Sequence, residues 1–249
     1  MPLKIRWLGH AGFRISFQDT ENIERVIYID AWLENPKIPE DFKKVPEDAD
    51  FVLVTHGHFD HASSAPAILK ASKKDTAKII TPGEVAKHYI SDCDIPESKT
   101  EKLGKGGTLD FGFCKISMVP ADHSSSCITK DGHIHTGGAP VGFIVSIAPL
   151  DATIYHFGDT NIFMDMSLIE ETFHPNILLL PIGDRFTMGP EGAALSVTKF
   201  FKSAKYIVPM HFDTFPLLTG TYEEFKEKLG DKKEMLVNTY EMLEKDWQI

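Results

Sequence analysis

A short stretch of the chain, residues 55–61, concentrates side chains that bind transition metals. It holds four of them: His56, His58, Asp60 and His61. The stretch directly follows the apolar run 51–54, which is typical of a buried strand, so the cluster lies where a strand gives way to a loop. Imidazole and carboxylate are good ligands for divalent transition metals, and no single ion needs all four. The excess indicates two metal ions side by side.

Three later positions repeat this pattern with one ligand each. His123, Asp159 and His211 each come just past the carboxyl end of a predicted strand. Loops that leave a common sheet edge converge there, which is a usual place for chemistry on a rigid scaffold. A lone His after a strand is more often a hydrogen-bonded structural residue, but together with the first cluster these residues supply enough ligands for two ions.

Other polar residues near the predicted strand ends are weaker candidates. Asp30 could accept the free N–H of a ligand His, and His10 could bind substrate or support a ligand, with ordinary polar packing as the alternative for both. Asp184 and Arg185 follow a buried strand, and Arg185 could hold an anionic group as a bidentate fork or form a surface ion pair.

The Ser- and Gly-rich segment 124–140 contains His133 and His135, and we expect it to be a mobile loop. The roles of these two histidines stay open.

Composition excludes several classes of protein. The chain has 249 residues and a net charge of −10, which argues against a general nucleic-acid or anionic-membrane surface. A small anionic substrate remains compatible, because two bound cations would reverse the charge locally. The three cysteines form no C-x-x-C pair, and no apolar run approaches the roughly 20 residues of a membrane span. We therefore expect a cytoplasmic protein that acts on a small molecule.

The predicted elements run in a definite order along the chain. Strands come first in hairpins and then alternate with helices, and this happens twice. One of the helices predicted in the second half covers residues 161–172. The order predicts two mixed β-sheets packed face to face with helices outside, an α/β fold of the αββα type. No linker of biased composition interrupts it, so we expect a single domain over residues 1–249.

The motifs resemble those of the metallo-β-lactamase superfamily. Residues 56–61 are similar to its His-x-His-x-Asp-His signature, and the three later ligands follow in the expected order. Residues 8–10, 29–30, 180–184, 186–191 and 208–216 resemble a branch of metal-dependent hydrolases related to ascorbate-6-phosphate lactonase and, more distantly, to N-acyl-phosphatidylethanolamine phospholipase D.

The resemblance implies an αββα sandwich with the site at one edge, and it implies an assignment of the ligands. His56, His58 and His123 would hold the first ion. Asp60, His61 and His211 would hold the second, and Asp159 would bridge. The ions would be zinc or manganese, although nickel and iron also accept such His and Asp sets.

We therefore expect a dinuclear hydrolase in which an activated water attacks a small ester, lactone or phosphodiester. Asp60 would bind the second ion and also orient or shuttle a proton. The alternative is a scaffold or sensor of the same fold without turnover. A nuclease is disfavoured by the acidic composition, and a diiron oxidoreductase by His58, where such enzymes usually carry Glu. Related proteins are often oligomers, so a homo-oligomer stays open.

Overall fold

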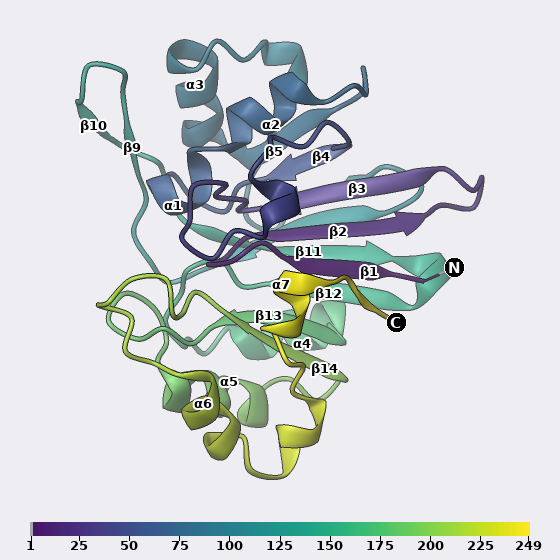
Figure 1. The fold of residues 1–249 in the computed structure, drawn as a ribbon, viewed down its shortest axis with the longest axis vertical. Coiled ribbons are helices and arrows are strands. Elements are labelled where there is room, and N and C mark those ends of the chain that lie inside the picture. The colour runs from purple at the N-terminus through teal and green to yellow at the C-terminus, as the bar shows by residue number, and fades with distance from the viewer. Residues whose placement is uncertain (1) are drawn as a thin grey trace. The chain divides into compact units, whose positions relative to one another are not determined.

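The computed structural model describes residues 2–249, which fall into two units that we take in turn (Figure 1). The first contains the residues up to Lys105 together with Ser124–Pro140 and Tyr240–Ile249. The second contains Gly106–His123 and Val141–Thr239. No helix in the described part of the chain is long and apolar enough to cross a membrane. A single domain over the whole chain stays a prediction.

The first unit is built on a seven-stranded mixed sheet. In spatial order its strands are β15 (Trp247–Gln248), β1 (Lys4–Trp7), β2 (Phe13–Gln18), β3 (Glu24–Ile29), β4 (Phe51–Leu53), β5 (Lys78–Pro82) and β6 (Thr100–Leu103). The strands from β15 to β3 pair antiparallel, whereas those from β3 to β6 pair parallel. Because β3 and β4 are parallel neighbours, the segments after Ile29 and Leu53 leave the sheet at the same edge.

Short helices complete the first unit. They are α1 (Phe59–Ala62), α2 (Ala65–Ala71), α3 (Gly83–Asp92), α7 (Glu241–Glu244) and the 3-10 turns Glu40–Phe42 and Glu97–Lys99. A hydrophobic core joins the sheet to α2 and α3, with Val52 and Ile79 of the sheet among its members and Ile68 and Val85 from the helices. This packing fixes β4, whose end carries the histidine cluster.

The segment predicted as a mobile loop instead forms a hairpin. Strands β9 (Ser126–Ile128) and β10 (Ile134–Thr136) pair antiparallel, and the hairpin projects away from α1 (Figure 1). Cys127 at its base is buried in the core of the first unit, whereas His133 and His135 are exposed. The two strands could not be predicted from the sequence, because each has only three residues and the flanking segments are rich in Gly and Ser.

The second unit is built on a six-stranded sheet. Its order is β14 (Tyr206–Met210), β13 (Ile177–Pro181), β12 (Ala152–His156), β11 (Val141–Ile147), β8 (Lys115–Pro120) and β7 (Thr108–Asp110). β12, β13 and β14 are parallel, and β11 runs antiparallel to both β12 and β8. The carboxyl ends of β8, β12, β13 and β14 therefore all reach one edge of this sheet.

The helices of the second unit are α4 (Met166–Phe173), α5 (Pro190–Lys199), α6 (Tyr222–Lys228) and the 3-10 segments Ala148–Leu150 and Gly230–Met235. The sequence predicted that α4 begins at residue 161. Instead, Asn161 donates its backbone N–H to the Asp122 carbonyl at 3.0 Å, and the helix begins only at Met166. A loop contact therefore overrides local helix preference at that point.

A group of aromatic rings lies in the core of the second unit. The rings of Tyr155 and Phe157 stack with centroids 3.8 Å apart, and Phe201 packs against both. The Tyr155 hydroxyl is buried and has no hydrogen-bond partner among the described residues, and burial raises the pKa of Tyr155 well above its usual value. This hydroxyl is dehydrated without compensation.

We therefore expect Tyr155→Phe to leave the free energy of unfolding unchanged or to raise it by about 1 kcal/mol, because a buried unsatisfied hydroxyl costs free energy. Urea denaturation would measure it. The matched control is Tyr28→Phe, since Tyr28 donates its hydroxyl to Asp48 Oδ1 at 2.8 Å and its removal should cost about 1 kcal/mol. A clear loss of stability in Tyr155→Phe would contradict the prediction.

Candidate metal centre

The histidine cluster lies in the turn between β4 and α1. His58 precedes the first residue of α1, and Asp60 and His61 lie in its only turn. His56 and His61 are fully buried, whereas His58 and Asp60 are partly exposed. The Nε2 atom of His56 lies 3.0 Å from Nδ1 of His58. Two ring nitrogens on one tetrahedral ion at roughly 2.0–2.1 Å would lie about 3.3 Å apart, so this spacing suits a shared ion.

Gly57 lets the hairpin approach this turn closely. A Cβ at Gly57 would lie 2.6 Å from Cys127 Sγ and 2.7 Å from the Ser126 carbonyl oxygen, and Ser125 Oγ accepts the Gly57 N–H at 3.1 Å. Burial raises the pKa of Cys127 to about 11, so the sulfur here is a neutral thiol and packs as an apolar group.

Asp30 organises the same turn from the end of β3. Its Oδ1 accepts the Thr55 N–H at 2.8 Å, and its Oδ2 accepts the Thr55 hydroxyl at 2.6 Å. Oδ2 also lies 2.8 Å from His61 Nδ1. A carboxylate accepts, so Nδ1 of His61 donates and Nε2 is the nitrogen whose lone pair can bind a metal.

Thr55 passes the same constraint to His56. Its hydroxyl proton goes to Asp30, so its oxygen accepts from His56 Nδ1, which lies 2.9 Å away. Nε2 of His56 is then the ligand nitrogen, and it is the atom that faces His58. The sequence analysis missed Thr55, although its place directly before His56 was the available signal.

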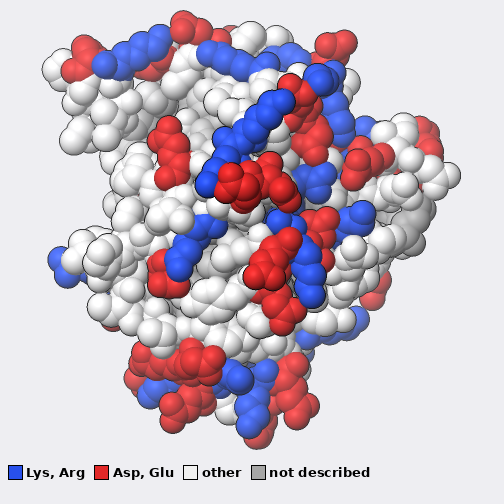
Figure 2. Space-filling model, viewed as in Figure 1, with Lys and Arg blue, Asp and Glu red and all other residues white. Residues whose placement is uncertain are grey.

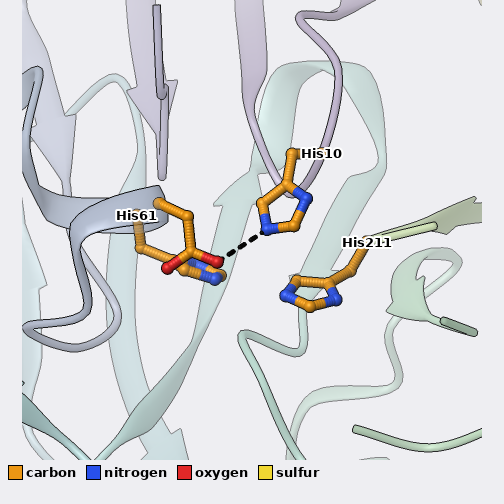
Figure 3. A group of neighbouring side chains, drawn as sticks. His10, His61 and His211 are labelled. Carbon is orange, nitrogen blue, oxygen red and sulfur yellow. Dashed lines mark hydrogen bonds and ion pairs between the residues drawn. The ribbon is translucent and has the colours of Figure 1, made fainter. Parts of the chain in front are cut away.

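His10 lies beside this cluster on the turn between β1 and β2. Its Nε2 is 2.9 Å from Asp60 Oδ2, as the dashed line in Figure 3 shows, and the ring is fully buried. Possible ligand atoms of His10, Asp60 and His61 lie within 4.8 Å of one another. The His10 backbone is in the left-handed region at φ 54°, and Trp7 Nε1 donates to the His10 carbonyl at 2.8 Å. His10 therefore contacts a predicted ligand, and its role in supporting that ligand or binding substrate stays a prediction.

The second unit gathers the three remaining predicted ligands. Asp159 Oδ2 lies 3.0 Å from His211 Nε2 and 3.6 Å from His123 Nε2. Asp159 and His211 are buried, and His123 is partly exposed. One carboxylate oxygen thus lies close to two imidazoles, which follow different strands of the sheet, β8 and β14.

Close backbone contacts hold these three residues. Asp122 donates its N–H to Thr160 Oγ1 at 2.9 Å, which ties the segment before His123 to the segment after Asp159. Beneath His211, a Cβ at Gly183 would lie only 2.0 Å from the His211 carbonyl oxygen, and His211 itself has a φ of 56°. Only glycine fits at position 183 with the His211 backbone where it is.

Asp184 and Arg185 are placed differently. Both are exposed, and the Asp184 carboxylate accepts a hydrogen bond from Thr219 Oγ1 at 3.4 Å. Within residues 2–249, no carboxylate pairs with Arg185, so the surface ion pair that the sequence left open is not formed. The exposed His133 lies 3.5 Å from Asp131 on the hairpin, so its ring pairs within that hairpin.

Comparison with known proteins identifies the family. The model described as the beta-lactamase superfamily domain matches residues 4–211. The UPF0173 metal-dependent hydrolase of Rubrobacter xylanophilus is 41% identical over 224 residues, which cover 90% of this chain and 87% of that protein. This chain belongs to the beta-lactamase superfamily.

Further relatives in the superfamily agree. The UPF0173 metal-dependent hydrolase of Azorhizobium caulinodans is 42% identical over 220 residues, covering 87% and 88% of the two chains. The structure of Igni18, a metallo hydrolase from Ignicoccus hospitalis, is 26% identical with a TM-score of 0.78 and covers 95% of this chain and 94% of that one. The isothiocyanate hydrolase from Delia radicum gut bacteria shares the fold at 21% identity and a TM-score of 0.65, with 95% of each chain covered.

These findings confirm the predicted fold class, the αββα fold of the metallo-β-lactamase superfamily. They also show that the protein is a metal-dependent hydrolase of that fold. The donor atoms of each unit fit this conclusion. The first unit offers the buried rings of His56 and His61 with assigned tautomers, and the second offers the buried Asp159 and His211.

Asp30→Asn should weaken metal binding by about 10- to 100-fold, because an amide cannot accept all three hydrogen bonds and the His61 tautomer is lost. Metal content after dialysis against a graded chelator would measure this. Asp50→Asn is the control: Asp50 is also buried, at the other end of β4, and accepts the Val26 N–H at 2.7 Å. Equal metal loss in both variants would show that general destabilisation, rather than ligand orientation, is responsible.

Proposed function

We propose that this hydrolase uses two divalent ions to cleave a small ester, lactone or phosphodiester. The observation that carries the proposal is Asp159, whose Oδ2 lies within 3.6 Å of both His123 Nε2 and His211 Nε2. Two imidazoles that follow different strands could each bind a different ion, and a carboxylate close to both could then be shared by the two ions. The four ligand-type residues of the histidine cluster support the same conclusion, since one ion would not use them all.

The proposed ligand assignment follows the motif order of the superfamily. In this assignment His56, His58 and His123 would hold the first ion, Asp60, His61 and His211 would hold the second, and Asp159 would be shared by both. The ligands are nitrogen and oxygen atoms without cysteine sulfur, and zinc or manganese suits them best, with nickel and iron also accepted. Two such ions, when bound, supply Lewis acidity and an activated water at neutral pH.

The chain's own residues complete the proposed mechanism. Asp60 is partly exposed, so one of its oxygens can orient the attacking water or accept a proton while the His10 ring at Oδ2 fixes the carboxylate. Asp30 and Thr55 hold His61 and His56 in the ligand tautomer throughout. The substrate is a small molecule. Acidic and basic side chains alternate over the face in Figure 2, and no broad basic stripe appears on that face.

A hydrolysis panel tests the proposal. Protein reconstituted separately with zinc and with manganese would be given bis(4-nitrophenyl) phosphate, a γ-lactone and 4-nitrophenyl acetate. We expect two ions per chain and turnover of at least one substrate. Asp60→Asn should keep most of the metal and lower kcat by roughly 10²–10⁴-fold, because it removes a positioned proton acceptor.

Full activity in Asp60→Asn would contradict the role of Asp60. One ion per chain with normal turnover would contradict the dinuclear mechanism. Two tightly bound ions without turnover of any ester class would favour a scaffold or sensor of the same fold.

A further inference from the structure

Arg185 lies on the loop after β13, and the loops on either side of it carry predicted metal ligands. β13 is the middle one of three parallel strands, with β12 on one side and β14 on the other. Asp159 follows β12, His211 follows β14, and Arg185 follows β13 at the same edge of the sheet. The carboxyl edge of parallel strands is where ligands usually bind in sheets of this kind.

Backbone hydrogen bonds tie the Arg185 loop to both neighbours. Met188 donates its N–H to the Thr160 carbonyl at 2.9 Å, next to Asp159. On the other side, Gly220 donates to the Gly183 carbonyl at 3.1 Å, which joins the loop after His211. The Arg185 loop is therefore fixed relative to Asp159 and His211 within the second unit.

The backbone of this loop is strained. Asp184 and Arg185 both have positive φ, 65° and 55°, and two consecutive non-glycine residues rarely adopt this region. The loop is closed by the Asp184 N–H, which donates to the Met188 carbonyl at 3.1 Å. Such strain is typical of functional positions, because packing around the loop must compensate for its cost.

The Arg185 guanidinium carries a charge that no acid of the described chain neutralises. It forms no ion pair within residues 2–249, although Asp and Glu number 36 against 26 Lys and Arg. The adjacent Asp184 carboxylate is engaged by Thr219 instead. The guanidinium carbon lies over the exposed Phe186 ring, 5.6 Å from its centroid, and Arg185 is itself exposed, so its N–H groups are accessible to a ligand.

We propose that Arg185 binds an oxyanion group, a carboxylate or a phosphate, on a substrate whose ester or lactone bond lies at the metal centre. The proposal rests on the proposed function and adds the substrate class, an anionic ester. The planar guanidinium matches both oxyanions as a bidentate fork, and Phe186 offers an apolar surface beside it. Arg185 is a specificity-determining residue and takes no part in bond cleavage.

Matched esters with one leaving group test the proposal. The metal-reconstituted protein would be given 4-nitrophenyl esters of glutarate, of 4-phosphonobutyrate and of glutarate monomethyl ester, which is neutral. Arg185→Met should lower kcat/KM for at least one anionic ester by about 10- to 100-fold, mainly through KM, and change the neutral ester by less than about 2-fold. Arg185→Lys should lower kcat/KM for that ester by a smaller factor. The anionic ester whose kcat/KM falls more in Arg185→Met identifies the recognised group.

The matched control is Lys199→Met. Lys199 Nζ lies over the ring of the next residue, Phe200, at 5.3 Å, as Arg185 does over Phe186, but it ends α5 instead of a strand-edge loop. We expect no change for any ester. An equal loss for anionic and neutral esters in Arg185→Met, or no preference for anionic esters in the native protein, would overturn the proposal.

A binding measurement separates this proposal from the proposed function. Calorimetry would compare glutaranilic acid, which is an amide and resists cleavage, with its primary amide, which is neutral and also carries no ester. We expect the acid to bind the native protein at least about 10-fold more tightly and Arg185→Met to abolish this difference. Equal binding of both compounds would overturn the role of Arg185 even if no ester were hydrolysed. Hydrolysis without any effect of Arg185 would leave the proposed function intact.

Discussion

The histidine cluster depends on the hydrogen bonds that the Asp30 carboxylate accepts. This carboxylate accepts hydrogen bonds from the Thr55 N–H, the Thr55 hydroxyl and the His61 ring, and it is fully buried. These bonds join the end of β3 to the turn after β4 and set which nitrogen of His61 and His56 can bind a metal. Without this acceptor, two buried imidazoles would be free to take the wrong tautomer.

The parallel pairing of strands explains why such contacts form at all. β3 and β4 are adjacent and parallel, so Asp30 and Thr55 leave the sheet at one edge. In the second unit β12, β13 and β14 are adjacent and parallel, so Asp159, Arg185 and His211 share an edge as well. In both units the sheet largely sets the position of a residue that lies a few positions past a strand. The predicted site residues can therefore lie on short, irregular loops and still be held in place.

Much of this could be predicted from the sequence, because the signals were local. Apolar runs marked the strands that precede the predicted ligands, and the types and spacing of His56, His58, Asp60 and His61 were enough to indicate metal chemistry. The hairpin at residues 126–136 could not be predicted, since its strands are three residues long and flanked by Gly and Ser. The predicted start of α4 was also wrong. The hydrogen bond from the Asn161 N–H to the Asp122 carbonyl keeps residues 161–165 irregular, so the helix begins only at Met166.

The sequence by itself determined the types and order of the predicted ligands and the superfamily, because these depend on residue identity and spacing. Only the tertiary structure decided how the predicted ligands are held. The positive φ values of His10, Asp30 and His211, the close approach that only Gly183 permits, and the lack of an acid paired with Arg185 in the described chain all depend on segments distant in sequence. Backbone strain and close approaches between segments arise from packing, and they cannot be predicted from the order of residues along the chain.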